Sequence, residues 1–224
     1  LEAFADGLAK LPLVYQPGTT WSYSVSLDLL GRVIEVVSGV PFDEYLNTNI
    51  FKPAGMTSTW FQVPESAIGR LTANYGGVLI PVDPANASIY TDKPAFPYGG
   101  AGLVSSPRDY DRFLRMLLGY GKIDGTRVMG ELAVRVGTSN LLPEAVDTTG
   151  TFADSAGFGA GGRVGLGNQA GTYGWGGAAG TVALVNMKVG LRASLFTQYM
   201  PSEAFPVHAA FPSAVMADLT AMKG

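Results

Sequence analysis

The chain has 224 residues, of which 47% are hydrophobic and 15% charged, so it can bury the core of one large domain or two small ones. A formal net charge of −3, with no run of like charges, argues against nucleic acid as a partner, because phosphate binding needs a concentrated basic face. The absence of cysteine and a single histidine, His208, exclude disulfides and the usual metal sites, so we expect neither a metal nor another cofactor.

The first strong helix signal lies at residues 26–38. Ser26 can cap its start, and Gly39 followed by Pro41 ends it. The apolar residues that recur there at helical spacing are Leu27, Leu30, Ile34 and Val37. A short helix is expected near residues 41–46. The proline-rich stretch from residue 50 to 98 predicts irregular connections with short strands.

A second clear helix begins at Ser106-Pro107, with serine as the N-cap and proline at the first helical position, and ends at Gly119. Its apolar face is formed by Tyr110, Phe113, Leu114 and Leu117. Two acidic residues of this helix precede an arginine at helical pair spacing. The pairs are Asp109 with Arg112 and Asp111 with Arg115, and we expect both on a solvated face.

The C-terminal part changes character. After a turn at Asp124-Gly125 and a helix near residues 130–138, strands are expected, with a hairpin at Gly190. The expected strands cover residues 158–164, 181–187 and 191–199. A last helix starts near Pro212 and turns three apolar residues inward. These residues are Val215, Met216 and Leu219.

This order of elements predicts an α+β fold: an antiparallel sheet flanked by helices, plus a helical lobe. We divide the chain into a mostly helical part, residues 1–150, and a part with the C-terminal strands and helix, residues 151–224. The uncharged stretch 164–187 contains seven glycines, so no membrane span is expected. The first residues carry neither an initiator methionine nor a signal pattern, which indicates a chain that begins inside a longer polypeptide. Its location stays open between bacterial cytoplasm and periplasm.

Two apparent motifs do not carry chemistry. Gly157, Gly159 and Gly162 match a dinucleotide fingerprint, but eleven of the 24 residues from 157 to 180 are glycine and no helix is expected to follow. A Ser-His-Asp triad needs a histidine beside a nucleophilic serine, and the chain holds no Gly-x-Ser-x-Gly elbow. We therefore expect His208 to be exposed or partly packed.

Four other segments are informative through the order in which they occur along the chain. They are Gln16-Pro-Gly-Thr-Thr-Trp-Ser-Tyr-Ser through Ser38-Gly39, Ile50-Phe-Lys-Pro-Ala-Gly-Met-Thr-Ser-Thr59, Gly99-Gly-Ala-Gly-Leu-Val-Ser-Ser-Pro107 and Tyr173-Gly-Trp-Gly-Gly-Ala-Ala-Gly-Thr181. Together they resemble the class C β-lactamase-like serine hydrolases, which have the penicillin-binding-protein fold. Trp-Gly-Gly in place of Lys-Thr-Gly is similar to the family VIII carboxylesterase branch.

The resemblance implies roles for specific residues. Tyr23 would be the catalytic general base, and the backbone N–H of Ala178 would form the oxyanion hole together with the N–H of the nucleophile. Trp175 would form a wall of the substrate pocket, and Gly176 and Gly177 would let substrate approach the backbone. The alternative interpretations are structural: Tyr23 as a packed loop aromatic, and Trp175 as a buried tryptophan beside a tight bend. We expect Trp175–Gly177 to open a strand at the edge of the sheet.

Two departures from the family pattern matter. No serine is followed three residues later by lysine, so the Ser-x-x-Lys nucleophile motif is expected upstream, in an N-terminal part that is absent and that a separate, nicked chain can supply. Without this part we expect the fold to be incomplete and the chain alone to be inactive. Ser24-Val25 follows Tyr23, whereas β-lactamases commonly have x-Asn after the corresponding tyrosine. This difference favours esters over β-lactams as substrates.

Three functions remain open at this stage. The first is hydrolysis of a small-molecule carboxylic ester through an acyl-serine intermediate. The second is amide chemistry on the same scaffold, as a β-lactamase, D-amino-acid peptidase or amide hydrolase. The third is a non-catalytic binding domain that has kept the fold.

Overall fold

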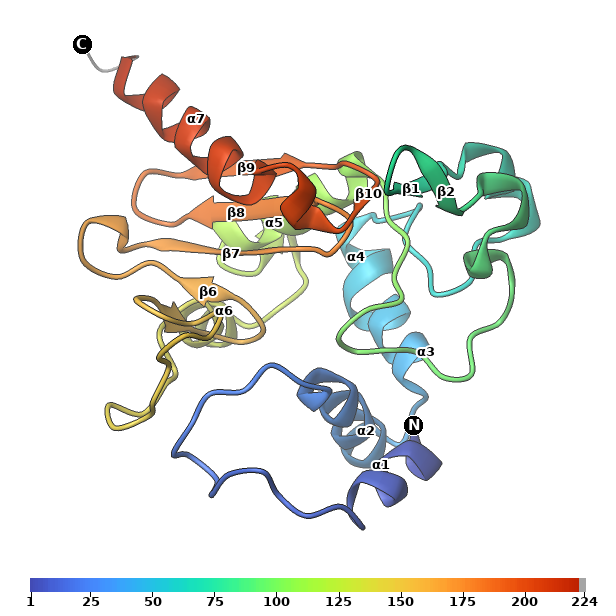
Figure 1. The fold of residues 1–224 in the computed structure, drawn as a ribbon, viewed down its shortest axis with the longest axis horizontal. Helices are drawn as coiled ribbons and strands as arrows, with labels where there is room; N and C mark the ends of the chain where they lie inside the picture. The colour runs from blue at the N-terminus through green and yellow to red at the C-terminus, as the bar shows by residue number, and fades with distance from the viewer. Residues whose placement is uncertain (222–224) are drawn as a thin grey trace.

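The computed structural model describes residues 1–221 (Figure 1). Its α-helices are α1 (Glu2–Leu8), α2 (Ser26–Ser38), α3 (Phe42–Leu46), α4 (Lys52–Ala54), α5 (Pro107–Leu118), α6 (Glu131–Gly137) and α7 (Val207–Ala221). Its strands are β1 (Asn74–Gly76), β2 (Ile80–Asp83), β3 (Lys122–Ile123), β4 (Thr126–Arg127), β5 (Gly157–Phe158), β6 (Arg163–Val164), β7 (Thr172–Gly176), β8 (Val182–Asn186), β9 (Leu191–Leu195) and β10 (Tyr199–Met200). A π-helical turn at Asn47–Phe51 joins α3 to α4.

The main sheet has five antiparallel strands in the order β5-β6-β7-β8-β9. Figure 1 shows α7 in front of this sheet and α5 behind it, and both helices contact β8. A smaller sheet has the strand order β10-β1-β2, and its strand β10 follows β9 along the chain. Helices α1 and α2 lie below the sheet in Figure 1. The predicted α+β class is therefore confirmed, whereas the division at residue 150 stays a prediction.

The main core lies between α5 and β8. Met116 of α5, Val134 of α6 and Val185 of β8 are its most completely buried large side chains. Phe51 and Ala54 add the second of the four motif segments to the same core. Burial of this apolar area is the main favourable contribution to folding, and it joins the helical connections to the sheet.

Both long predicted helices in the first part of the chain are confirmed, with one capping error. Ser106 accepts a hydrogen bond from the backbone N–H of Asp109 at the start of α5, as predicted. Ser26 caps nothing: it is the first helical residue of α2, the N-cap is Val25, and no side chain accepts a hydrogen bond there. Gly39 ends α2 in the left-handed conformation, which glycine adopts without a steric cost.

The apolar side of α2 is exposed. Val37 has 82% of its side-chain surface accessible, and Leu30 has 50%. The other apolar residues of α2 that are exposed are Leu27, Leu29, Val33 and Val36. A run of this kind on one helix is larger than the scattered apolar residues of an ordinary surface.

The prediction of solvated ion pairs on α5 is wrong. Asp109 is only 2% exposed, and its carboxylate accepts hydrogen bonds from the backbone of Ser58 and the hydroxyl of Thr59. Arg112 turns instead toward the carbonyl of Ala54 and pairs with Asp124. The remaining two charges, Asp111 and Arg115, pair with Arg192 and Asp124. Tertiary contacts have replaced the local pairs that helical spacing suggests.

The predicted strand at residues 158–164 is a hairpin, β5 and β6, with a glycine turn between them. Gly162 leaves room for the ring of Tyr173, since a Cβ at this glycine would lie 2.8 Å from the ring atom Cε2. The Tyr173 hydroxyl donates to the carbonyl of Ala160 at 2.6 Å. The glycines that mimic a nucleotide motif therefore accommodate an aromatic ring.

The last helix starts five residues earlier than predicted, because Pro212 lies inside α7 and not at its start. Of the three residues expected to point inward, Val215 and Leu219 are partly buried. Met216 is 50% exposed, so this part of the prediction is wrong.

Candidate active site

Tyr23 lies in the loop that leads into α2. A short bridge holds this loop: the Trp21 N–H donates to the Asp147 carbonyl at 2.9 Å, and the Asp147 N–H donates to the Thr19 carbonyl at 2.9 Å. The Tyr23 side chain is 58% exposed. The ring is thus not buried beneath α2, and both its catalytic role and the alternative of a packed loop aromatic stay predictions.

The glycine-rich segment that starts at Gly99 supports the start of α2. The Gly100 N–H donates to the carboxylate of Asp28 at 3.1 Å, and Asp28 is buried. A Cβ at Gly99 would collide with the carbonyl oxygen of Leu27, so the chain can approach here only as glycine. Two of the four segments are thus in contact, and both fix the loop that carries Tyr23.

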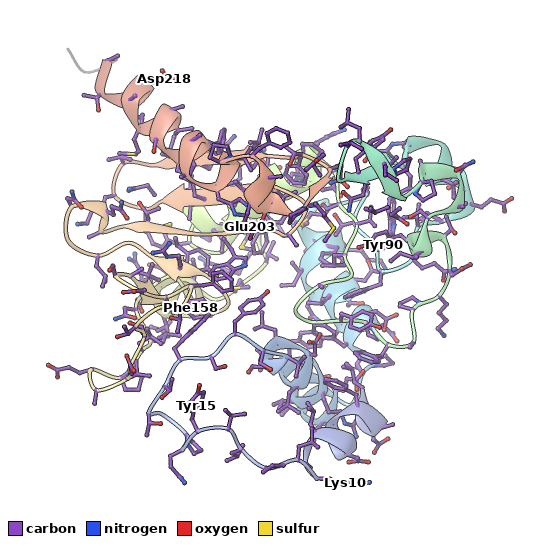
Figure 2. All side chains as sticks on the ribbon, viewed as in Figure 1. Lys10, Tyr15, Tyr90, Phe158, Glu203 and Asp218 are labelled. Atoms are coloured by element: carbon purple, nitrogen blue, oxygen red, sulfur yellow. The ribbon has the colours of Figure 1, made fainter. Side chains whose placement is uncertain are left out.

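Tyr23 and Trp175 stack on one another. Their ring centroids are 6.0 Å apart and the rings are tilted by 10°. Phe152 stands edge-on to both rings, at 5.4 Å from Tyr23 and 6.1 Å from Trp175. Phe158 contacts Trp175 edge-on at 5.6 Å, and Trp21 contacts Phe158 at 5.1 Å. Figure 2 shows Phe158 between the sheet and the loop that carries Tyr15.

These five rings, Trp21, Tyr23, Phe152, Phe158 and Trp175, form what we call the aromatic cluster. The structure thus brings together the predicted residues Tyr23 and Trp175, which are 152 positions apart. The sequence reasoning missed Phe152 and Phe158. Their only local signal is their place at the start of the glycine-rich stretch that holds Trp175: Phe152 precedes it and Phe158 is its second residue.

A hollow of about 500 Å³ opens beside Tyr23. Its walls include Tyr15, Trp21, Asp147, Thr151 and Phe152. The N–H and hydroxyl of Thr149 bond to this carboxylate and hold the pKa of Asp147 below its ordinary value. Asp147 therefore brings a negative charge to the hollow at neutral pH, and the rest of the lining combines aromatic rings with threonine, serine and glycine.

Trp175 and Gly176 end strand β7 and do not open one, so that prediction is wrong. β7 is also an interior strand of the sheet, not an edge strand. However, β6 pairs only with Tyr173 and Gly174, so the last two residues of β7 extend past it. On the other side they pair with β8.

The turn after β7 is tightly closed. The Gly177 N–H donates to the Thr181 carbonyl at 2.8 Å, and the Gly180 N–H donates to the Gly177 carbonyl at 3.0 Å. Among residues 1–221, the N–H of Ala178 has no acceptor. An unpaired backbone donor at the tip of such a turn is a suitable partner for a negatively charged oxygen.

His208 is exposed, as predicted, and its Nε2 lies 3.1 Å from the Gly177 carbonyl oxygen. Within the part of the chain that the structure describes, no three acidic or histidine side chains are grouped as metal ligands. None of the helices described there reaches the length and apolarity that crossing a bilayer demands.

The site thus combines an exposed phenol, stacked on Trp175, with a nearby glycine turn whose Ala178 N–H is unpaired among the described residues, on an α+β scaffold. The β-lactamase family model matches residues 2–213. The chain therefore belongs to the β-lactamase family, whose members are hydrolases.

Individual relatives agree with this assignment. The chain is 35% identical to Protein Rv1367c of Mycobacterium tuberculosis over 147 residues, which is 64% of this chain and 36% of that protein. It is 27% identical to Esterase EstB of Burkholderia gladioli over 223 residues, 85% of this chain and 52% of the esterase. The LovD6 mutant of simvastatin synthase from Aspergillus terreus has a similar fold, with a TM-score of 0.76 and 23% identity, over 88% of this chain and 55% of that one. The chain spans about a third to a half of these proteins.

Proposed function

We propose that this chain is part of a serine hydrolase that cleaves carboxylic esters through an acyl-serine intermediate. The observation that carries the proposal is the stacking of Tyr23 on Trp175, because it joins the first and the last of the four motif segments in one site. Tyr23 serves as the general base, the N–H of Ala178 is one oxyanion donor, and the aromatic cluster binds the acyl or alcohol group.

The chemistry follows from what an ester requires. A serine hydroxyl attacks the carbonyl carbon only when a base takes its proton. In the proposal the Tyr23 phenolate takes this proton and passes it to the leaving alkoxide, which departs as the alcohol. The Ala178 N–H stabilises the negative charge on the carbonyl oxygen meanwhile. Water then attacks the acyl-serine by the reverse proton route and releases the acid.

The nucleophile and the cation that keeps Tyr23 deprotonated must come from another part of the protein. A free tyrosine titrates at a pH of about 10, so a phenolate near neutral pH needs a positive charge close by. None of the serines in the sequence is followed by lysine at the third position. The exposed apolar residues of α2 further support the proposal that another segment packs there.

Two features support an ester rather than an amide as the substrate. Ser24-Val25 follows Tyr23, so the asparagine amide that would contact the acylamide of a β-lactam is missing. Trp175 occupies the position of the lysine in Lys-Thr-Gly. The relative EstB is named as an esterase, which agrees with this preference.

The test uses the full-length protein that contains this chain. We expect it to hydrolyse a p-nitrophenyl ester faster than nitrocefin, and a fluorophosphonate to label a serine outside residues 1–224. Tyr23→Phe should lower kcat by about 10²-fold or more, because general-base catalysis is lost. Tyr15→Phe, a half-exposed tyrosine of the same hollow, is the matched control.

Three outcomes would overturn parts of the proposal. Near-normal turnover by Tyr23→Phe rejects the role of the phenol. Faster turnover of nitrocefin than of the ester favours amide chemistry. Failure of the protein to turn over either compound or to take up the fluorophosphonate favours a binding domain without catalysis.

A further inference from the structure

Helix α7 places the only histidine of the chain against the Trp-Gly-Gly segment. His208 is the second residue of α7, and its Nε2 lies 3.1 Å from the carbonyl oxygen of Gly177. A carbonyl oxygen can only accept a hydrogen bond, so in this contact Nε2 carries the hydrogen and donates it. The exposed ring therefore has a defined orientation.

The carbonyl that His208 contacts belongs to a particular peptide. The Gly177 C=O and the Ala178 N–H are the two ends of one planar unit, so a group that fixes the direction of the carbonyl also fixes the direction of the N–H. The Gly180 N–H donates to the same oxygen at 3.0 Å. Two donors on one carbonyl polarise the peptide, and this makes its N–H a stronger donor.

Gly176 makes room for the imidazole. A Cβ at this position would lie 2.9 Å from Nε2 and 3.0 Å from both Cδ2 and Cε1 of His208, closer than a real Cβ approaches other atoms. The ring thus lies directly over the α-carbon of Gly176 on the side of α7. The contact and the absent side chain are independent observations, and both place the ring against this backbone.

We propose that His208 is a positioning residue: its Nε2–H donates to the Gly177 carbonyl and so holds the Ala178 N–H in the direction that binds the oxyanion. The inference rests on the proposed function, since it needs Ala178 to be an oxyanion donor. It assigns α7 a role in catalysis and gives a reason for glycine at position 176.

The experiment compares four variants of the full-length protein with the wild type. His208→Ala should lower kcat for a p-nitrophenyl ester about 3- to 10-fold with KM nearly unchanged, a part of the 10²- to 10³-fold that loss of a whole oxyanion donor costs. His208→Gln should restore most of kcat, because its amide N–H can reach the same carbonyl. Gly176→Ala should resemble His208→Ala, because its Cβ displaces the ring. Ser213→Ala, whose exposed hydroxyl bonds only within α7, is the control and should match the wild type.

A second measurement does not depend on turnover. The amide ¹H and ¹⁵N resonances of Ala178 should shift in His208→Ala and return toward the wild-type values in His208→Gln. Unchanged kcat and unchanged Ala178 resonances in His208→Ala would overturn the inference, even if the variant has a lower Tm, because His208 would then only attach α7 to the sheet. A wild-type protein that hydrolyses no ester would instead reject the proposed function, and the resonances would still report whether His208 polarises this peptide.

Discussion

Replacing Gly177 by alanine tests how tightly the turn after β7 is built. The φ angle of Gly177 lies outside the left-handed region, so backbone strain does not oppose the change. The added Cβ would, however, lie closer than 3.0 Å to the hydroxyl oxygen of Thr181, so one of the two must move. Overpacking of this kind costs about 1–3 kcal/mol in the free energy of unfolding. Because the Ala178 N–H shares the peptide of Gly177, a shift of the turn also misplaces this donor, and we expect kcat to fall by about 10- to 100-fold.

A double-mutant cycle separates the collision from other effects of the substitution. Its four proteins are the full-length wild type, Gly177→Ala, Thr181→Ala and the double variant, each measured by urea unfolding and by p-nitrophenyl ester turnover. Thr181→Ala alone should change stability by about 1 kcal/mol or less, because the side chain is only partly buried. It should also relieve the collision, so the double variant should be more active than Gly177→Ala, with a coupling energy of about 1–2 kcal/mol. The reasoning is refuted if the second substitution rescues nothing, or if Gly177→Ala behaves as the wild type.

Two further predictions concern stability. Asp109→Ala should lower the free energy of unfolding by about 2–4 kcal/mol, because it leaves the Ser58 N–H and the Thr59 hydroxyl without their buried acceptor. Urea unfolding measures this loss of stability, and a loss below about 1 kcal/mol would contradict the prediction. Burial, and then the nearby Tyr110, raise the pKa of Tyr173 to about 12. As the pH rises, the unfolded chain therefore loses the Tyr173 proton before the folded chain does, so the free energy of unfolding should fall between about pH 10 and 12. The fall should be less steep in Tyr173→Phe. Equal slopes of unfolding free energy against pH in the two proteins would argue against the prediction.

The elements that could be predicted from the sequence are those whose signals are local. Ser106 and Pro107 define the start of α5 because the cap and the first turn involve only neighbouring residues. Gly39 ends α2 for the same reason. Pro212 misled the prediction of α7, because proline usually starts a helix or breaks it, whereas here the helix continues through it.

Features that depend on distant contacts could not be predicted in this way. The pairing of Asp109 with Ser58 and Thr59 crosses about fifty residues, and helical spacing indicated a different partner. The strand expected at residues 158–164 is interrupted because Tyr173 packs against its glycines. The β propensity of residues 158–164 carries no information about the ring of Tyr173.

The residues of the candidate site could likewise be predicted only in part. Tyr23 and Trp175 could be chosen from motif order alone, and the structure brings their rings together, whereas their roles stay a prediction. Phe152 and Phe158 complete the aromatic cluster only through the fold. His208 had no motif around it, because its contact with Gly177 depends on how α7 lies on the sheet.

The electrostatics of the hollow beside Tyr23 explain why the proposed chemistry needs more than this chain. Asp147, negatively charged at neutral pH, lines the same hollow. Among the described residues that line the hollow there is no lysine or arginine to offset it. A free tyrosine titrates at a pH of about 10, so the proposed base near neutral pH needs a cation brought to it, and a lysine three residues after the nucleophilic serine would deliver the cation and the nucleophile together. In the proposed mechanism the residues of this chain supply the oxyanion donor and the base, and the charge that makes the base effective enters with the nucleophile.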